Sequence, residues 1–164
     1  MSSEIAYFAG GCFWGMEHEY QKLPGVLTVV SGYMGGSTSQ PTYREICDGD
    51  TGHAEVVQVT YDPSVTTYAD LLEMFWEVHD PTTLNRQGVD VGHQYRSAIF
   101  TVSDAQEEQA RASLEAAAVF FHSPIVTEIA PAPPFWPAED YHQDYIERTG
   151  KASCHIRRKR VPVR

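Results

Sequence analysis

The chain has 164 residues, of which 42% are hydrophobic, 12% aromatic and 21% charged, and its formal net charge is −10 at pH 7. This length fits one compact domain over residues 1–164, and the aromatic and aliphatic content is too high for a disordered chain. No apolar run reaches the roughly 18 residues that a membrane span needs, and the acidic balance argues against nucleic acid as a partner.

The hydrophobic pattern alternates between the period of a strand and that of a helix along the chain. Capping patterns at Thr67 and Ser103 mark two helix starts. Residues 34–52 are dense in Gly, Ser, Thr, Asp and Pro, and so long an irregular stretch is usually functional or mobile; residues 80–95 are also irregular. We expect strands at residues 5–8, 26–33, 54–61, 97–102 and 126–129, and helices at 12–23, 67–78, 103–118 and around 139–145.

This order of elements predicts an α+β fold, in which helices pack on a mixed sheet. Beyond Pro131 the chain is rich in Pro and aromatic residues, and we expect an irregular C-terminal tail that is mobile from about residue 148. Five of the twelve Lys and Arg side chains fall among the last eight residues. We interpret them as a solvated tail on an acidic body, in preference to a site for nucleic acid or membrane.

The three cysteines do not form a structural disulfide framework, since their number is odd and no CxxC pair occurs. The seven His are scattered, so a metal site is poorly supported. The N-terminus lacks the basic start and long apolar stretch of a secretory signal, which favours the reducing cytoplasm. The cysteines are therefore either inert thiols or centres of thiol chemistry.

Cys12 follows a Gly-Gly turn and lies at or just before a predicted helix start. The helix dipole and the free N–H groups there favour the thiolate, which makes Cys12 a candidate nucleophile. Phe13 and Trp14 can wall an adjacent pocket for an apolar substrate group. The alternatives are a small buried side chain at position 12 and ordinary core aromatic residues at 13 and 14.

Glu55 lies on a predicted strand, where it shares a face with Val57, Val59 and Tyr61. Burial at the edge of an apolar face raises the pKa of a carboxyl group, so Glu55 is a candidate neutral hydrogen-bond donor or general acid. The alternative is that Glu55 precedes the regular strand and points to water.

Tyr43, Tyr95 and Asp90 lie in the two irregular segments. A phenol can donate a hydrogen bond to a polar substrate oxygen while its ring packs on apolar atoms. Asp90 can orient a water molecule or a neighbouring hydroxyl. Tyrosines that merely cover the surface, and an aspartate that merely makes a turn, remain alternatives.

Cys154 lies in the tail, close in sequence to His155, Arg157 and Arg158, which favour its thiolate. Such a thiol can reach a sulfenic acid and close a disulfide, or it can be a spare surface cysteine. Cys47 is flanked by acidic residues and is the least reactive of the three by this reasoning.

Together these segments resemble the A-type peptide methionine sulfoxide reductases. The resemblance runs from about Ile5 to Cys154, and several motifs occur in the right order. The matching stretches are Gly10-Gly11-Cys12-Phe13-Trp14-Gly15, Gly32-Tyr33-Met34-Gly35-Gly36, Pro41-Thr42-Tyr43-Arg44-Glu45, Gly49-Asp50-Thr51-Gly52-His53-Ala54-Glu55, Tyr61-Asp62-Pro63, Phe75-Trp76-Glu77-Val78-His79-Asp80-Pro81-Thr82, Asn85-Arg86-Gln87-Gly88, Gln94-Tyr95-Arg96-Ser97, and Ala138-Glu139-Asp140-Tyr141-His142-Gln143 with Tyr145.

The resemblance implies a mixed sheet flanked by helices, with a ferredoxin-like two-layer core. One compact domain without a heptad pattern favours a monomer. It implies reduction of the S epimer of methionine sulfoxide, free or in proteins, with thioredoxin as external reductant and no bound cofactor. The implied roles are nucleophile for Cys12, acid for Glu55, holders of the sulfoxide oxygen for Tyr43 and Tyr95, methyl pocket for Phe13 and Trp14, water-positioning for Asp90, and recycling thiol for Cys154.

Two positions depart from the family pattern: Val89 stands where Asn is common, and His93 where Thr is common. Two other functions stay open on the sequence. A cysteine hydrolase would pair Cys12 with His53 or His93, because its mechanism needs a histidine within hydrogen-bond reach of the thiol. A non-catalytic domain would bind oxidised or Met-rich segments without turnover.

Overall fold

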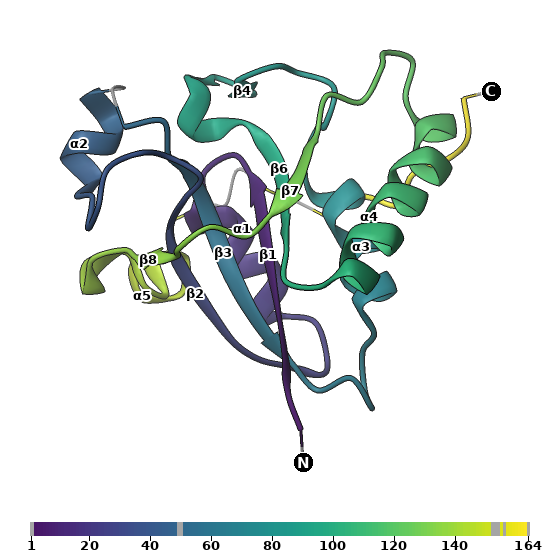
Figure 1. The fold of residues 1–164 in the computed structure, drawn as a ribbon, viewed down its shortest axis with the longest axis horizontal. Helices are drawn as coiled ribbons and strands as arrows, with labels where there is room; N and C mark the ends of the chain where they lie inside the picture. Colours follow the sequence, from purple (N-terminus) through teal and green to yellow (C-terminus); the bar gives the residue numbers. More distant parts are fainter. Residues whose placement is uncertain (1, 49–50, 152–154, 156, 164) are drawn as a thin grey trace.

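The computed structural model describes residues 2–48, 51–151, 155 and 157–163 (Figure 1). A six-stranded sheet and a two-stranded hairpin carry five α-helices and three 3-10 turns within that part of the chain. The strands are β1 (Glu4–Gly10), β2 (Val26–Met34), β3 (Ala54–Tyr61), β4 (Arg86–Gln87), β5 (Asp90–Val91), β6 (Ser97–Thr101), β7 (Glu128–Pro131) and β8 (Trp136–Pro137). The helices are α1 (Phe13–Gln21), α2 (Tyr43–Asp48), α3 (Tyr68–Val78), α4 (Asp104–Ala117) and α5 (Tyr145–Thr149), with 3-10 turns η1 (His93–Tyr95), η2 (Ala118–Phe120) and η3 (Asp140–His142).

The sheet order is β7-β6-β1-β3-β2-β8. Its four central strands pair antiparallel, and they come from the chain order β1-α1-β2-β3-α3-β6. Numbered along the chain, these strands stand in the order 4-1-3-2, which is the ferredoxin-like arrangement. The predicted α+β fold is therefore confirmed, and β7, which pairs parallel to β6, makes the sheet mixed.

Helices α1 and α3 cover one face of the sheet because their apolar stripes meet the inward side chains of β1 and β3. Phe8 of β1 stacks on Tyr20 of α1 at 5.2 Å between ring centroids and contacts Phe75 of α3 at 5.4 Å. All three side chains are fully buried. Burial of such large side chains stabilises the fold by about 1.5–3 kcal/mol each.

The other face of the sheet is covered by an irregular segment of the chain rather than by helices. The connection from β7 to β8 crosses the sheet (Figure 1), and its Phe135 packs on Tyr7 of β1 with ring centroids 5.4 Å apart. None of the helices within the described residues has the length and apolar character to cross a bilayer.

The irregular segments contain more regular structure than the sequence pattern predicts. The first holds α2, which buries Ile46 alone, and the second holds the β4–β5 hairpin and η1. Helices and strands this short contain too few residues to show a hydrophobic period, so the sequence pattern does not predict them. The single short helix expected around 139–145 is in fact η3 followed by α5, because Asp144 adopts a left-handed conformation (φ 55°) between them.

The described part of the C-terminal tail lies along the end of α3. Arg157 pairs with Glu77 at 2.7 Å, and the Arg158 backbone N–H donates to the Glu77 carbonyl at 2.9 Å. The guanidinium of Arg160 donates to the backbone carbonyls of Trp76 and His79. These basic residues thus contact an acidic side chain and the negative end of a helix, and the mobility of the tail stays a prediction.

Candidate active site

Cys12 lies between the end of β1 and the start of α1, as the N-cap residue of that helix. Gly11 turns the chain there with φ +100°, and a Cβ at this position would lie 2.8 Å from Gln87. Glycine is required on both counts. Cys12 is half-buried at the positive end of α1, so its predicted position at the helix start is confirmed. The thiolate that the helix dipole would favour there stays a prediction.

Glu55 is the second residue of β3 and is only 2% exposed. Its Oε1 accepts a hydrogen bond of 3.1 Å from the backbone N–H of Phe13, the first residue of α1. The predicted face of β3 is confirmed, since Val57, Val59 and Tyr61 lie in the same core cluster. A carboxyl group therefore meets the helix start beside the thiol, and the alternative that Glu55 points to water is wrong.

Tyr43 opens α2 and Tyr95 closes η1, and both side chains are half-buried. Burial raises the pKa of each phenol well above its ordinary value, and the nearby Glu55 carboxyl, whenever it is ionised, acts in the same direction. Cys12 acts on the pKa of Tyr95 in the same direction. Two neutral phenols thus stand close to the carboxyl group, although they come from segments 52 residues apart in the sequence.

Asp90 is half-buried in the β4–β5 hairpin, where it pairs with Gln87. Its negative charge contributes to the raised pKa of Tyr95. Gln87 also limits the space at Gly11, next to Cys12. The hairpin therefore forms one border of the site, with Asp90 on the side of Tyr95.

Phe13 and Trp14 form an aromatic wall beside Cys12. Phe13 is 1% exposed, and its ring lies 5.6 Å from that of Tyr33. Trp14 is half-buried and stacks on Tyr145 of α5 at 3.9 Å. Because one ring is buried and the next is accessible, the pair can bind a small apolar group at the surface.

Three residues complete this wall that the sequence reasoning does not single out: Glu139, His142 and Tyr145. Nδ1 of His142 accepts a hydrogen bond of 2.9 Å from Trp14 Nε1 and so fixes the indole ring. Burial lowers the pKa of His142, which keeps its ring neutral. In the sequence these three residues appear only within the matching stretch at 138–145, and that stretch carries no recognisable chemistry on its own.

Glu139 ties the aromatic wall to α2. One carboxyl oxygen accepts from the Tyr33 hydroxyl at 3.1 Å, and the other accepts from the backbone N–H of Tyr43 at 3.0 Å. Although burial acts in the opposite direction, these hydrogen bonds hold the pKa of Glu139 below its ordinary value. An ionised Glu139 therefore anchors the start of α2.

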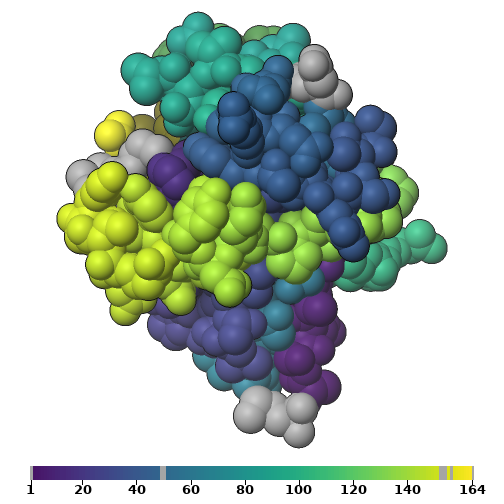
Figure 2. Space-filling model, turned by 90° about the vertical axis from the view of Figure 1, so that its left-hand side faces the viewer, coloured from purple at the N-terminus to yellow at the C-terminus, as the bar shows by residue number. Residues whose placement is uncertain are grey.

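These elements meet on one face of the molecule. Figure 2 shows α2 (blue), the region of β4 and β5 (teal) and the α5 region (yellow-green) around a small patch of N-terminal atoms (purple). The structure brings together Cys12, Phe13, Trp14, Tyr43, Glu55, Asp90 and Tyr95.

The other two cysteines are Cys154 and Cys47. Cys154 lies outside the described residues, whereas His155 is 2% exposed and its Nε2 lies 2.6 Å from the Gly10 carbonyl. Cys47 is exposed near the end of α2, and its proximity contributes to the raised pKa of both Tyr43 and Tyr95.

His53 is not a base for Cys12. Its Nδ1 accepts from the Gly36 N–H at 3.0 Å, and its Nε2 lies 2.6 Å from the Thr38 carbonyl, so both ring nitrogens are occupied. This removes one of the two histidines that a cysteine hydrolase would use. Over the described ranges, no group of three or more His, Cys, Asp or Glu side chains is arranged to hold a metal ion.

Comparison with known proteins gives matches over nearly the whole chain. A family described as "Peptide methionine sulfoxide reductase" matches residues 4–162. The "Peptide methionine sulfoxide reductase MsrA" of Geobacter sulfurreducens is 55% identical over 155 residues, covering 93% of this chain and 96% of that protein. Reduced Mxr1 from Saccharomyces cerevisiae superposes with a TM-score of 0.91 at 38% identity, covering 96% of this chain and 93% of that one. Mxr1 in complex with Trx2 gives a TM-score of 0.67 at 28% identity, covering 96% and 91%.

Proposed function

This chain belongs to the peptide methionine sulfoxide reductase family, and from that premise we propose how its own residues reduce methionine sulfoxide. The enzyme is an oxidoreductase that acts on methionine sulfoxide. We assign to it the S epimer, free or within oxidised proteins. The substrate methyl group binds against Phe13 and Trp14, which follow Cys12 in the chain and whose ring centroids lie 6.4 Å apart.

In the first step, Cys12 attacks the substrate as a thiolate. The sulfoxide sulfur becomes electrophilic when its oxygen is hydrogen-bonded or protonated, and the neutral Glu55 carboxyl with the Tyr43 and Tyr95 phenols supplies these donors. The bond between the sulfoxide oxygen and the substrate sulfur breaks, and this oxygen ends on the Cys12 sulfur with the proton from Glu55. The products are methionine, reduced by two electrons, and a Cys12 sulfenic acid.

In the second step, Cys154 converts the Cys12 sulfenic acid into a disulfide. Its sulfur attacks the Cys12 sulfenic acid, an S–S bond forms, and the oxygen departs as water. A thioredoxin dithiol then reduces the disulfide and is itself oxidised. The position of His155, whose ring contacts the Gly10 carbonyl two residues before Cys12, supports this pairing.

The remaining assignments follow from this chemistry. No metal or bound organic cofactor takes part, because the two thiols and the external dithiol carry all the electrons. Recycling by a dithiol suits a reducing compartment, and we assign the enzyme to the cytoplasm as a monomer of one domain. Asp90 supports Tyr95 or a bound water molecule.

The hydrogen bond from Phe13 to Glu55 carries the proposal, because it places an acid at the helix start that holds the thiol. The test is an assay of resolved methionine sulfoxide epimers with dithiothreitol as reductant. We expect methionine from the S epimer alone. Equal turnover of the R epimer, or binding without turnover, would contradict the assignment.

A further inference from the structure

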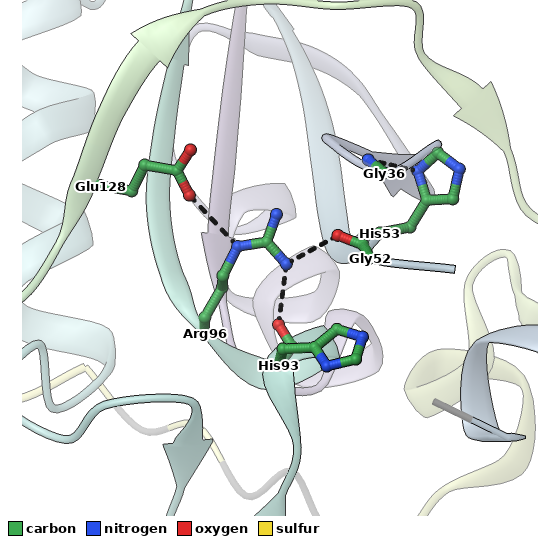
Figure 3. Close-up of polar contacts among 6 residues, drawn as sticks. All are labelled: Gly36, Gly52, His53, His93, Arg96 and Glu128. Atoms are coloured by element: carbon green, nitrogen blue, oxygen red, sulfur yellow. Dashed lines mark hydrogen bonds and ion pairs between the residues drawn. The ribbon is translucent and has the colours of Figure 1, made fainter. Parts of the chain in front are cut away.

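Arg96 makes an unusual set of contacts directly beside the site. It follows Tyr95 in sequence, and only 15% of its side chain is exposed. A single guanidinium nitrogen, Nη1, donates to two backbone carbonyls: that of His93 at 2.9 Å and that of Gly52 at 3.0 Å (Figure 3). Nε donates to Glu128 of β7 at 3.2 Å.

The two carbonyls belong to the segments that carry a phenol and the acid. His93 opens η1, the turn that ends at Tyr95. Gly52 lies three residues before Glu55, just ahead of β3, with φ +75°. Because both hydrogen bonds share one nitrogen, the guanidinium fixes these two backbone segments relative to each other.

A second set of bonds extends the network from β3 towards α2. His53 follows Gly52, and its ring bridges the Gly36 N–H and the Thr38 carbonyl on the loop that leads to Tyr43 (Figure 3 shows the Gly36 contact). A Cβ on Gly36 would lie 2.4 Å from the His53 backbone nitrogen, so the two segments pack without spare room. The loop before α2 is therefore held against the start of β3.

We infer that Arg96 is a positioning residue for sulfoxide reduction, which holds Tyr95 and Glu55 at a fixed separation around the sulfoxide oxygen. This inference rests on the proposed function and deepens it. Arg96 acts through the backbone of its partners and donates to no substrate atom. A shift of about 1 Å at a catalytic group can cost 100-fold in rate, so such a clamp affects the chemical step.

Arginine is needed for geometry rather than for charge. The planar guanidinium directs its N–H groups in a fixed fork, whereas a lysine ammonium is a point charge on a flexible stem. The ion pair with Glu128 is a lesser contact, since 47% of the Glu128 side chain is exposed and exposed pairs contribute about 0–1 kcal/mol. The clamp on the two carbonyls and the ion pair can thus be separated by mutation.

The experiment compares Arg96→Lys and Arg96→Gln with the wild-type enzyme in single turnover. Methionine formation is measured without recycling reductant, per titrated Cys12 thiol, over a range of methyl sulfoxide concentrations. We expect the maximal rate to fall about 10- to 100-fold in both variants, with the half-saturating concentration changed less than about threefold. Circular dichroism and thermal unfolding report whether each variant is folded.

Two controls isolate the clamp. Glu128→Gln removes only the ion pair, and Arg111→Gln removes an exposed arginine of α4 that pairs with Glu107. We expect both variants to form methionine at the wild-type rate. A wild-type single-turnover rate in Arg96→Lys would overturn the inference, as would failure of this variant to fold, because Arg96 would then be purely structural. If the wild-type enzyme itself formed no methionine, the proposed function would fall instead.

Discussion

The backbone N–H of Phe13 donates to the Oε1 atom of Glu55 across 42 residues of sequence. This bond joins the first helical residue after Cys12 to a carboxyl group that is almost fully buried. In the proposed mechanism, Oε1 accepts from the backbone, and the other carboxyl oxygen carries the proton that Glu55 donates.

Replacement of Glu55 by Gln tests the acid. Gln keeps an oxygen that can accept from Phe13 but has no proton to transfer, so we expect methionine formation to slow by about 10²- to 10⁴-fold. The measurement is single-turnover methionine formation, and Glu73→Gln on the exposed face of α3 is the matched control. Near-normal reduction by Glu55→Gln would mean that another group protonates the oxygen.

Glu17 of α1 makes stability depend on pH. The side chain is 1% exposed, and its Oε1 accepts from the Asp144 N–H at 2.7 Å. Burial raises the pKa of Glu17 from 4.5 to about 7 in the folded protein. The stability this gives is fully present below pH 4.5 and is lost as the pH rises through about 7, since the folded state binds the proton more tightly.

The corresponding experiment is urea unfolding of the wild type and Glu17→Gln at pH 5.5 and 8.5. Between pH 5.5 and pH 8.5, we expect the free energy of unfolding of the wild type to fall by about 2 kcal/mol more than that of the variant. Buried His79 changes stability in the opposite direction, because burial lowers its pKa to about 3, and it is common to both proteins. Parallel pH curves for the two proteins would show that Glu17 is ionised throughout.

Peptide mapping tests the recycling thiol. After one turnover without reductant we expect a Cys12–Cys154 disulfide, because attack by a second thiol on a sulfenic acid is its normal fate. In Cys154→Ser the sulfenic acid should persist long enough to be trapped by dimedone. Cys47→Ser should behave as the wild type, and a Cys12–Cys47 bond in the wild type would refute this pairing.

The contact between the tail and α3 predicts a second effect on recycling. Arg160 donates to the carbonyls of Trp76 and His79, so Arg160→Ala releases the tail downstream of Cys154. We expect disulfide formation to slow severalfold while methionine formation is unchanged. Lys159→Ala removes the same charge from an exposed position and serves as the control. Equal disulfide rates in both variants would exclude an anchoring role for Arg160.

Much of the site is encoded locally. The Gly-Gly turn and the helix start around Cys12 are features of adjacent residues, and alternation along β3 places Glu55 on the buried face. The capping box of Thr67 and Asp70 is formed as the pattern predicts. These predictions succeed because a turn, a cap or a strand face depends on the next few residues only.

Which distant segments meet depends on the tertiary packing. The pattern of residues along the chain was enough to predict the α+β fold, the helix that presents Cys12 and the face of β3 that buries Glu55. It gave no signal for the ring of His142 on the indole of Trp14, 128 residues away, or for the reach of Arg96 to the Gly52 carbonyl. Such contacts depend on the order of the strands in the sheet and on where the C-terminal part of the chain packs. Two side chains that are far apart in sequence produce no periodic pattern of hydrophobic residues that would indicate their contact.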